Sequence, residues 1–360
     1  MFVAWRDLRF AKGRFALMGA VVVLITLLVG LLSGLTAGLG EQNISAITGL
    51  PADKIVFAAP ADGQSLSYAN SAITDAQRRQ WAETPGVTAA EPLGIATTKA
   101  AAGNRSAGIS VFGVRQGSAL APDGGKIADG SVVLSTSAAD ALGVRSGDTI
   151  AVAGRPLTVA AVTGDAWFSH TPVVWAGLDV WAKTVPPAGG EPNATVLALT
   201  ATAGTDLAAA DLAAGTKTVS KGDSLSAIGS YTSENGSLQL MRGFLFAISA
   251  LVIGAFFTVW TIQRSGDIAV LKALGASTPF LLKDALGQAV VLLVGGTAIG
   301  TGLAVGLGAV VAGSAVPFLL TPSTVLVPAA VMILLGALGA ALSVRRITSV
   351  DPLTALGSAR

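Results

Sequence analysis

The chain has 360 residues, of which 52% are hydrophobic and only 12% are charged. A soluble domain carries about 25% charged residues, so an ordinary soluble protein is a poor fit. The formal net charge of +2, without basic runs interleaved with aromatic residues, argues against nucleic-acid binding. Because cysteine is absent, disulfides, thiolate catalysis, cysteine-ligated zinc and covalently attached c-type haem are excluded.

The hydrophobic residues are concentrated in long uncharged stretches. Residues 15–40, 243–263 and 285–344 contain no charged side chain. A bilayer-spanning helix needs about 20 apolar residues, so the first two stretches each fit one span and the third fits two. The sequence therefore predicts an α-helical membrane protein with four transmembrane helices.

The N-terminal segment 1–40 holds the first predicted helix, residues 15–39. Four basic residues and one acid precede this helix: Arg6, Arg9, Lys12, Arg14 and Asp7. Such a basic cluster prefers the cytoplasm, so the chain is expected to cross outward. A cleaved signal peptide has a similar pattern, but its apolar run is usually shorter, and three more spans follow here.

Residues 41–237 are predicted to form a mixed α/β extracytoplasmic domain. A helix is expected after an N-cap at Thr74, and a strand followed by a helix that ends at Gly143. Alternating residues around Gly154–Arg155 predict a hairpin. A further strand is expected in residues 192–201 and a helix in residues 205–215. Four aromatic residues are expected in the core of this domain: Trp167, Phe168, Trp175 and Trp181.

The remaining segments complete the predicted topology. The second helix, residues 238–263, returns inward to a cytoplasmic coupling loop, residues 264–284. Helices three and four are placed at residues 285–312 and 325–344, within segment 285–344, and a cytoplasmic tail covers residues 345–360. All three predicted cytoplasmic pieces are rich in Lys and Arg. We therefore expect a multi-pass protein of a bacterial cytoplasmic membrane with both termini inside.

Glycine spacing predicts close helix packing in the membrane. Gly30, Gly34 and Gly38 recur every fourth residue in the first helix, and Gly302 and Gly306 do so in the third. This spacing places small residues on one face, where another helix or a flat ligand can approach the backbone. For the glycine-rich third helix, chance spacing explains the pattern equally well.

The predicted coupling loop contains a short amphipathic helix. Ile268, Leu271 and Leu274 fall near helical spacing, and Gly275 can end the helix. Such a helix is expected at the inner face of the membrane.

Three segments of the chain carry a recognisable pattern: "FFTVWTI", the following "QRSGDIAVLKALGAS" and the tail "SVDPLTALG". Together they resemble the permeases of the macrolide-exporter, lipoprotein-releasing and cell-division (FtsX-like) ABC superfamily. The resemblance implies a permease dimer that works with two cytoplasmic ATPase subunits, which hold ATP and Mg²⁺. It also implies that the loop helix docks onto the ATPase through Asp267, Ile268, Leu271, Lys272 and Leu274. Asp267 stands where the superfamily usually has Glu, which keeps the carboxylate.

A narrower resemblance concerns "SGLTAGLGEQNIS" and "GSYTSENGSLQLM", which are similar to the haem-efflux permeases of Gram-positive bacteria. It implies that haem is captured as a transported ligand from the outer part of the membrane, within the permease dimer. No prosthetic group is implied.

Helical spacing places a possible haem face at the start of the second helix. If the helix begins early, five residues share one face: Tyr231, Glu234, Leu238, Met241 and Leu245. Tyr, Glu and Met can each offer an electron pair to haem iron, and Glu234 is the expected iron ligand. Glu41 is the competing acid. Glu234 could instead serve only the helix dipole, and Gly236 could break the helix.

No catalytic signature is present. The sequence contains no Walker A motif, no G-x-S-x-G and no H-E-x-x-H, so the chain is expected not to be an enzyme and ATP hydrolysis must lie on another chain. The single histidine, His170, is expected to be structural. Two alternatives to haem export stay open: export of another amphipath (a lipopeptide, a macrolide or a lipoprotein), and a non-transporting transmitter that controls a cell-wall hydrolase.

Overall fold

The computed structural model describes residues 12–185, 193–263, 266, 270–272, 274–311 and 316–345. Its internal contacts divide the chain into two units. We name Gly40–Gly236 the α/β unit, and Met1–Leu39 together with Ser237–Arg360 the helical unit. Helix α2 (Lys12–Thr48) and helix α7 (Tyr231–Gln263) each contribute residues to both units.

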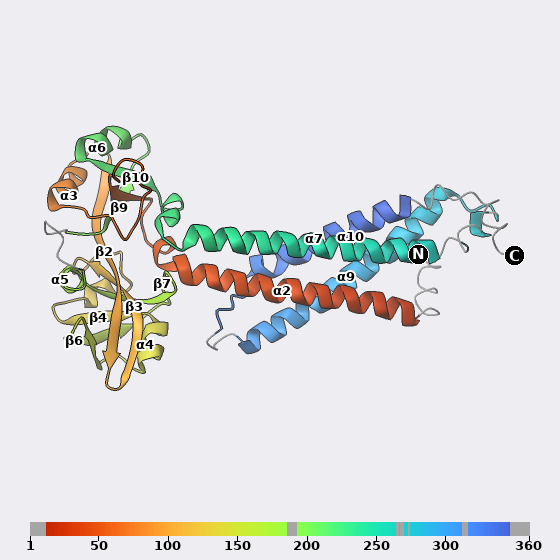
Figure 1. Cartoon of the computed structure of the whole chain (residues 1–360), viewed down its shortest axis with the longest axis horizontal. Helices are drawn as coiled ribbons and strands as arrows, with labels where there is room; N and C mark the ends of the chain where they lie inside the picture. The colour runs from red at the N-terminus through yellow and green to blue at the C-terminus, as the bar shows by residue number, and fades with distance from the viewer. Residues whose placement is uncertain are drawn as a thin grey trace. The chain divides into compact units, whose positions relative to one another are not determined.

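The α/β unit is built on a β-sheet (Figure 1). Within the described residues, the strands of this sheet follow one another in the order β10, β1, β9, β2, β3, β8, β4, β6 and β5, and β7 pairs with β8. A further pairing of β2 with β5 closes six of these strands into a ring. The long strand β2 connects this ring to the remaining strands β9, β1 and β10. Its first half pairs with β9, and its second half pairs with β3. The strands are β1 (Lys54–Ala58), β2 (Val87–Ala102), β3 (Arg105–Val114), β4 (Ser131–Leu134), β5 (Thr149–Val152), β6 (Arg155–Val162), β7 (Trp167–Phe168), β8 (Thr171–Gly177), β9 (Val196–Ala201) and β10 (Thr216–Ser220).

The local sequence signals of this unit are largely confirmed. Helix α3 (Asp75–Ala82) follows the N-cap Thr74, and α4 (Thr136–Leu142) ends at Gly143, whose φ of 68° is left-handed. Strand β9 and helix α6 (Leu207–Ala214) also lie in the expected segments, and a short helix α5 (Leu178–Ala182) follows β8. The predicted hairpin turn at Gly154–Arg155 is wrong by one residue. Ala153 and Gly154 carry the positive φ angles, because Arg155 already pairs with Val152.

The N-cap of α3 leads to a testable prediction. The backbone N–H of Gln77 donates to Thr74 Oγ1 (3.3 Å), and the backbone N–H of Thr74 donates to Gln77 Oε1 (3.0 Å). Because Thr74→Ala removes one half of this capping box, it should lower the free energy of unfolding by about 1 kcal/mol. Urea unfolding of the full-length protein, followed by circular dichroism, measures the loss. Thr74→Ser keeps the hydroxyl and should behave like the wild type; equal losses for both variants would contradict the capping role.

Aromatic side chains fill the core of the α/β unit. Phe168, Trp175 and Trp181 are buried as predicted, whereas Trp167 is only partly buried. Phe112 makes edge-to-face contacts with Phe168 and Trp175, at ring-centroid distances of 5.6 and 5.1 Å. This packing fixes the β7–β8 hairpin that is described below.

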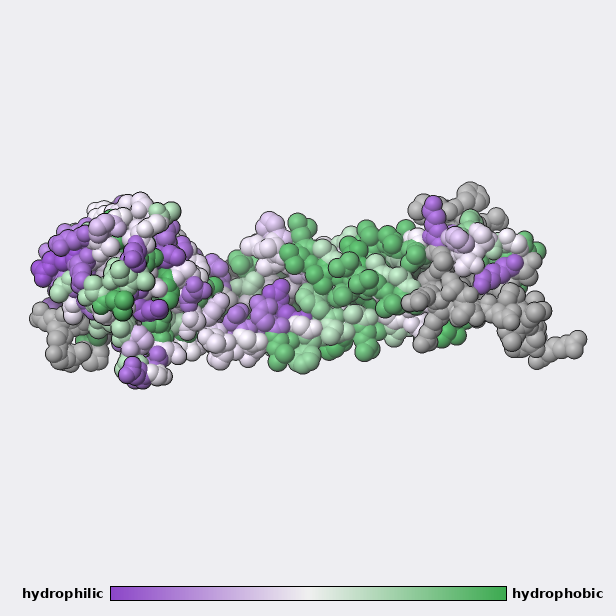
Figure 2. Space-filling model, turned by 90° about the horizontal axis from the view of Figure 1, so that it is seen from above, coloured by the Kyte–Doolittle hydropathy of each residue, from purple (hydrophilic) through white to green (hydrophobic). Residues whose placement is uncertain are grey.

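The helical unit has the apolar helices that the composition requires. Within the described residues, four helices are long and apolar enough to cross a membrane: α2, α7, α9 (Thr278–Val311) and α10 (Pro322–Arg345). Hydrophobic side chains cover much of the surface of these helices, while the α/β unit shows more hydrophilic ones (Figure 2). The chain is therefore a multi-pass membrane protein with a mixed α/β domain after its first helix.

The helices are longer than hydropathy predicts. Four predicted bounds are wrong: the end of helix one at residue 39, and the starts of helices two, three and four at residues 238, 285 and 325. Hydropathy marks only the apolar part of a helix, whereas backbone hydrogen bonds continue into polar turns. Thus α7 runs unbroken through Gly236, and α9 begins inside the predicted loop 264–284. Helix α10 begins on Pro322, whose fixed φ suits a first helical position.

Candidate functional site

Glu234 lies in the first turn of α7, where its carboxylate accepts two hydrogen bonds within the α/β unit. Asn43 Nδ2 donates to Glu234 Oε2 over 2.8 Å. His170 Nε2 lies 2.7 Å from the same oxygen and donates to it, since an ionised carboxylate only accepts. Asn43 is buried, whereas the side chains of His170 and Glu234 are 32% and 41% exposed. Solvent or a ligand can therefore reach the pair.

A tight hairpin turn positions His170. Strands β7 and β8 pair from Phe168 to Thr171, so Ser169 and His170 alone form the turn. Both have positive φ angles, 48° and 61°, as two-residue hairpin loops with matching twist require.

The turn is held against α2 by hydrogen bonds. The backbone N–H groups of Ser169 and His170 donate to the carbonyls of Asn43 and Gln42, each over 3.0 Å. The N–H of Trp167 donates to Ser45 Oγ over 2.9 Å. Ser45 Oγ also donates to the carbonyl of Trp167 over 3.4 Å, and because these four bonds join the hairpin to α2, the imidazole of His170 is held in a fixed place beside Glu234.

Glu234 Oε1 is left available for a ligand. Within the described residues, the hydrogen bonds of this carboxylate all involve Oε2, and none reaches Oε1. Hydrogen bonds from Asn43 and His170 orient the carboxylate, and such supporting partners strengthen a ligating group. The arrangement can present one carboxylate oxygen to a cation or to a metal carried by a ligand.

The other residues predicted at this site differ in their surroundings. Tyr231 is partly buried against the aromatic core of the α/β unit, and Glu41 is exposed. In the helical unit, Leu238 is partly buried and Met241 is 48% exposed. Sequence reasoning missed the contact of His170 with Glu234, because the 64 residues between them carry no sign of this pairing.

The glycines of α2 lie in close contacts inside the helical unit. A Cβ on Gly30 would stand 2.7 Å from Ala304 Cβ of α9, and one on Gly34 would overlap the ring of Phe318. At Gly38 it would overlap the backbone carbonyl of Pro317. These approaches require glycine, because any side chain would push the neighbouring segment away.

For Gly302 and Gly306 of α9, the structure favours chance spacing over a packing role. Gly302 and Gly306 have no atom within 4 Å of a Cβ built on them, whereas Gly296, Gly300 and Gly308 face Val22, Thr26 and Phe318. Both sets share the spacing of four, so spacing alone could not choose between the two faces of α9.

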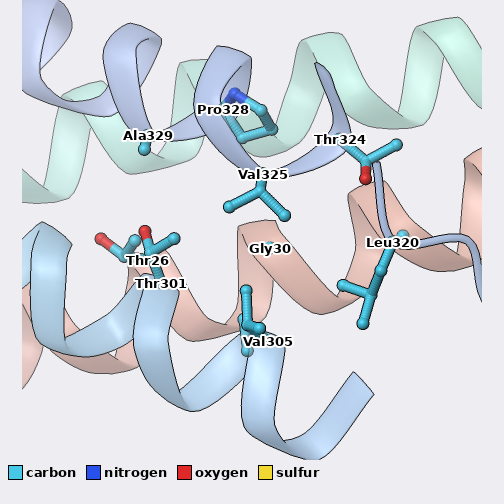
Figure 3. A pocket seen from close by; sticks show the side chains of 11 residues that line it. Thr26, Gly30, Thr301, Val305, Leu320, Thr324, Val325, Pro328 and Ala329 are labelled. Carbon is cyan, nitrogen blue, oxygen red and sulfur yellow. The ribbon is translucent and has the colours of Figure 1, made fainter. Parts of the chain in front are cut away.

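A small cavity lies between α2, α9 and α10 in the helical unit. Thr26, Gly30, Val305 and Val325 are among the residues that surround it (Figure 3). Its volume is about 10 Å³. Ligand pockets are usually about 300 Å³ or larger, so a substrate cannot occupy this space unless the helices separate.

The predicted coupling segment is described only in part. Asp267 and Ile268 lie outside the described residues. Gly275 ends the helical turn of residues 270–272 as predicted. Its φ is 95°, its N–H donates to Lys272 O, and the N–H of Ala276 donates to Leu271 O. The side chains of Leu271 and Leu274 are 37% and 78% exposed.

Two family models match successive parts of the chain. Residues 15–216 match the MacB-like periplasmic core domain, which is more than half of the chain, and residues 240–352 match the FtsX-like permease C-terminal model. The chain belongs to the FtsX/MacB family of ABC transporter permeases. Permeases of this family are not themselves enzymes. That the chain belongs to the family implies a cytoplasmic ATPase partner.

Relatives of this permease extend over its full length. It is 24% identical over 360 residues to a Staphylococcus epidermidis protein named as hemin transport system permease HrtB, with 99% of each chain covered. It is 25% identical over 375 residues to an ABC transporter permease of Mycobacterium tuberculosis, again with 99% of each covered.

Solved structures also match part of the permease. The periplasmic region of MacB from Actinobacillus actinomycetemcomitans covers 49% of this chain and 92% of its own, with 14% identity and a TM-score of 0.34. The extracellular domain of the transporter YknZ from Gram-positive bacteria covers 47% and 99%, with 13% identity and a TM-score of 0.35.

The exposed leucine of the coupling segment gives a second prediction. Leu274→Asp should weaken binding of the ATPase partner about tenfold, because it places a charge where an apolar contact is expected. Co-purification of the ATPase with the tagged permease, quantified over a concentration series, measures the change. Leu212→Asp is the matched control, since Leu212 is also exposed, at 87%, but lies in the α/β unit. Equal effects of both substitutions would refute the docking role.

Proposed function

We propose that this permease exports haem from the membrane, powered by a separate cytoplasmic ATPase. In this proposal two copies of the permease work with two ATPase subunits, which hold ATP and Mg²⁺. Both termini of the permease lie in the cytoplasm, so the α/β unit is extracytoplasmic. Haem is the cargo, and the permease needs no prosthetic group.

Two kinds of support favour haem over other amphipaths. The relatives from staphylococci are named as hemin transport permeases and align over 99% of both chains. The single structural observation that carries the proposal is the oriented carboxylate of Glu234, with Oε2 held by Asn43 and His170. A carboxylate oxygen can ligate ferric iron, and its hydrogen-bonded partners keep it in place. Tyr231, Leu238, Met241 and Glu41 stay predictions for this ligand.

The proposed transport mechanism depends on the coupling segment that connects α7 to α9 in the chain. ATP binding closes the ATPase pair, and the coupling segment passes this motion to α7 and α9, which flank it in the chain. In this proposal Glu234 holds the iron of the haem. Movement of α2 and α7 then releases the cargo outward.

Titration of the purified full-length permease with haemin tests this proposal. The expected result is a shift of the Soret band that saturates as haemin fills the proposed site at Glu234. Once the ATPase is added, haemin should also stimulate ATP hydrolysis. A macrolide and a lipopeptide serve as competing ligands. If haemin does not bind while either competitor stimulates ATP hydrolysis, the substrate assignment is wrong. If no ligand does so and the protein co-purifies with a cell-wall hydrolase, the transmitter alternative replaces export.

A further inference from the structure

Arg242 lies on the face of α7 that turns toward the interior of the helical unit. The buried residues of α7 in this unit recur at helical spacing: Ser249, Ile253, Phe257, Trp260 and Thr261. Toward the start of the helix, this buried face continues through the partly buried Leu245 and Phe246 to Arg242. The opposite face is exposed and apolar, with Met241, Phe244, Ile248 and Leu251. Arg242 therefore does not belong to the exposed face.

The guanidinium group of Arg242 has no partner in the described part of the chain. Its Nε is buried and makes no hydrogen bond, and no ion pair includes this residue. Among the described residues of the helical unit, Asp284 is the only acid, and its Oδ2 accepts a hydrogen bond from Gln288. Within the described residues, Arg242 is thus a cation on the inner face of the helical unit that no carboxylate pairs with, Asp284 included, although Asp284 Oδ1 is itself buried without a partner.

A charge in this position is costly unless it is used. Charged residues within membrane spans are rare, face the interior of a bundle and pair with another group. An arginine that only anchors a helix extends along the lipid-facing surface to the headgroups. The guanidinium fork is planar and matches a carboxylate with two parallel hydrogen bonds.

We propose that Arg242 binds a carboxylate of the transported substrate, so that the permease selects amphipathic anions over neutral analogues of the same shape. This inference rests on the proposed export of haem, which carries two propionate groups on an apolar macrocycle. Arg242 thereby selects the substrate by contacting a propionate group at the edge of the macrocycle, and this contact does not depend on any bond to iron.

Binding of haemin and of its dimethyl ester to the full-length permease in lipid nanodiscs tests the inference. The ester keeps the iron and the ring but lacks both negative charges. The wild type should bind haemin at least about tenfold more tightly than the ester, as loss of a charge-assisted pair predicts. Arg242→Gln should reduce this preference to about twofold or less, and Arg242→Lys should keep most of it.

The outcomes separate this inference from the proposed function. If the wild type binds neither compound, haem export itself fails and the inference fails with it. If the wild type binds both equally, or Arg242→Gln weakens both by the same factor, only the role of Arg242 is overturned, and a structural or lipid-phosphate contact explains the residue. Unchanged affinity of Arg242→Gln for the ester shows that the variant is folded, which makes a selective loss of haemin binding interpretable.

Discussion

Gly38→Ala is expected to destabilise the helical unit by about 1–3 kcal/mol, and Gly38→Leu by more. The added Cβ would overlap the backbone carbonyl of Pro317, and a backbone group cannot rotate away as a side chain can. The segment that carries Pro317 and Phe318 must then move off α2. Thermal unfolding of the full-length protein in detergent measures the loss.

The matched controls for this prediction lie in α9. Gly302→Ala and Gly306→Ala replace helical glycines that have no neighbour within 4 Å. Alanine has the higher helix propensity, so these variants should be neutral or slightly more stable. If they lose as much stability as Gly38→Ala, the close approach of Pro317 to α2 is not the cause.

Glu234→Gln is expected to weaken haemin binding by about tenfold to a hundredfold. Glutamine has nearly the same shape and can still accept the hydrogen bond from Asn43, but it lacks the negative charge that favours ferric iron. Titration followed at the Soret band measures the affinity, and unchanged thermal unfolding shows that the fold is kept.

Two further variants make the result specific. Glu41→Gln changes the other acid predicted near this site and should leave the affinity within about twofold. His170→Asn keeps a residue that tolerates positive φ but removes the imidazole, so the affinity should fall about tenfold through the loss of a supporting hydrogen bond. A normal affinity of Glu234→Gln combined with a large loss in Glu41→Gln would move the site to Glu41.

The membrane helices and the mixed α/β domain could be predicted because their signals are local. Long uncharged stretches mark the spans, and the N-cap at Thr74 and the C-cap at Gly143 mark helix ends within a few residues. The family resemblance likewise depends on continuous segments. These features need no knowledge of which distant residues meet.

The site could be predicted only in part, because it depends on contacts between distant segments. The sequence position of Glu234 at the start of the second helix predicts it as a candidate ligand, but the contacts from Asn43 and His170 depend on how the β7–β8 hairpin docks onto α2. The choice between the glycine faces of α9 has the same origin, since a spacing of four does not tell which face meets α2.

ATP-driven haem transfer from proteoliposomes that contain the permease and its ATPase tests haem export most directly. Haem is loaded into the membrane, and an apo haem-binding protein outside reports its release by absorbance. ATP is expected to accelerate transfer from wild-type vesicles, and Glu234→Gln is expected to abolish most of this acceleration. Transfer that is equally fast without ATP, from a complex that hydrolyses ATP normally, would contradict haem export.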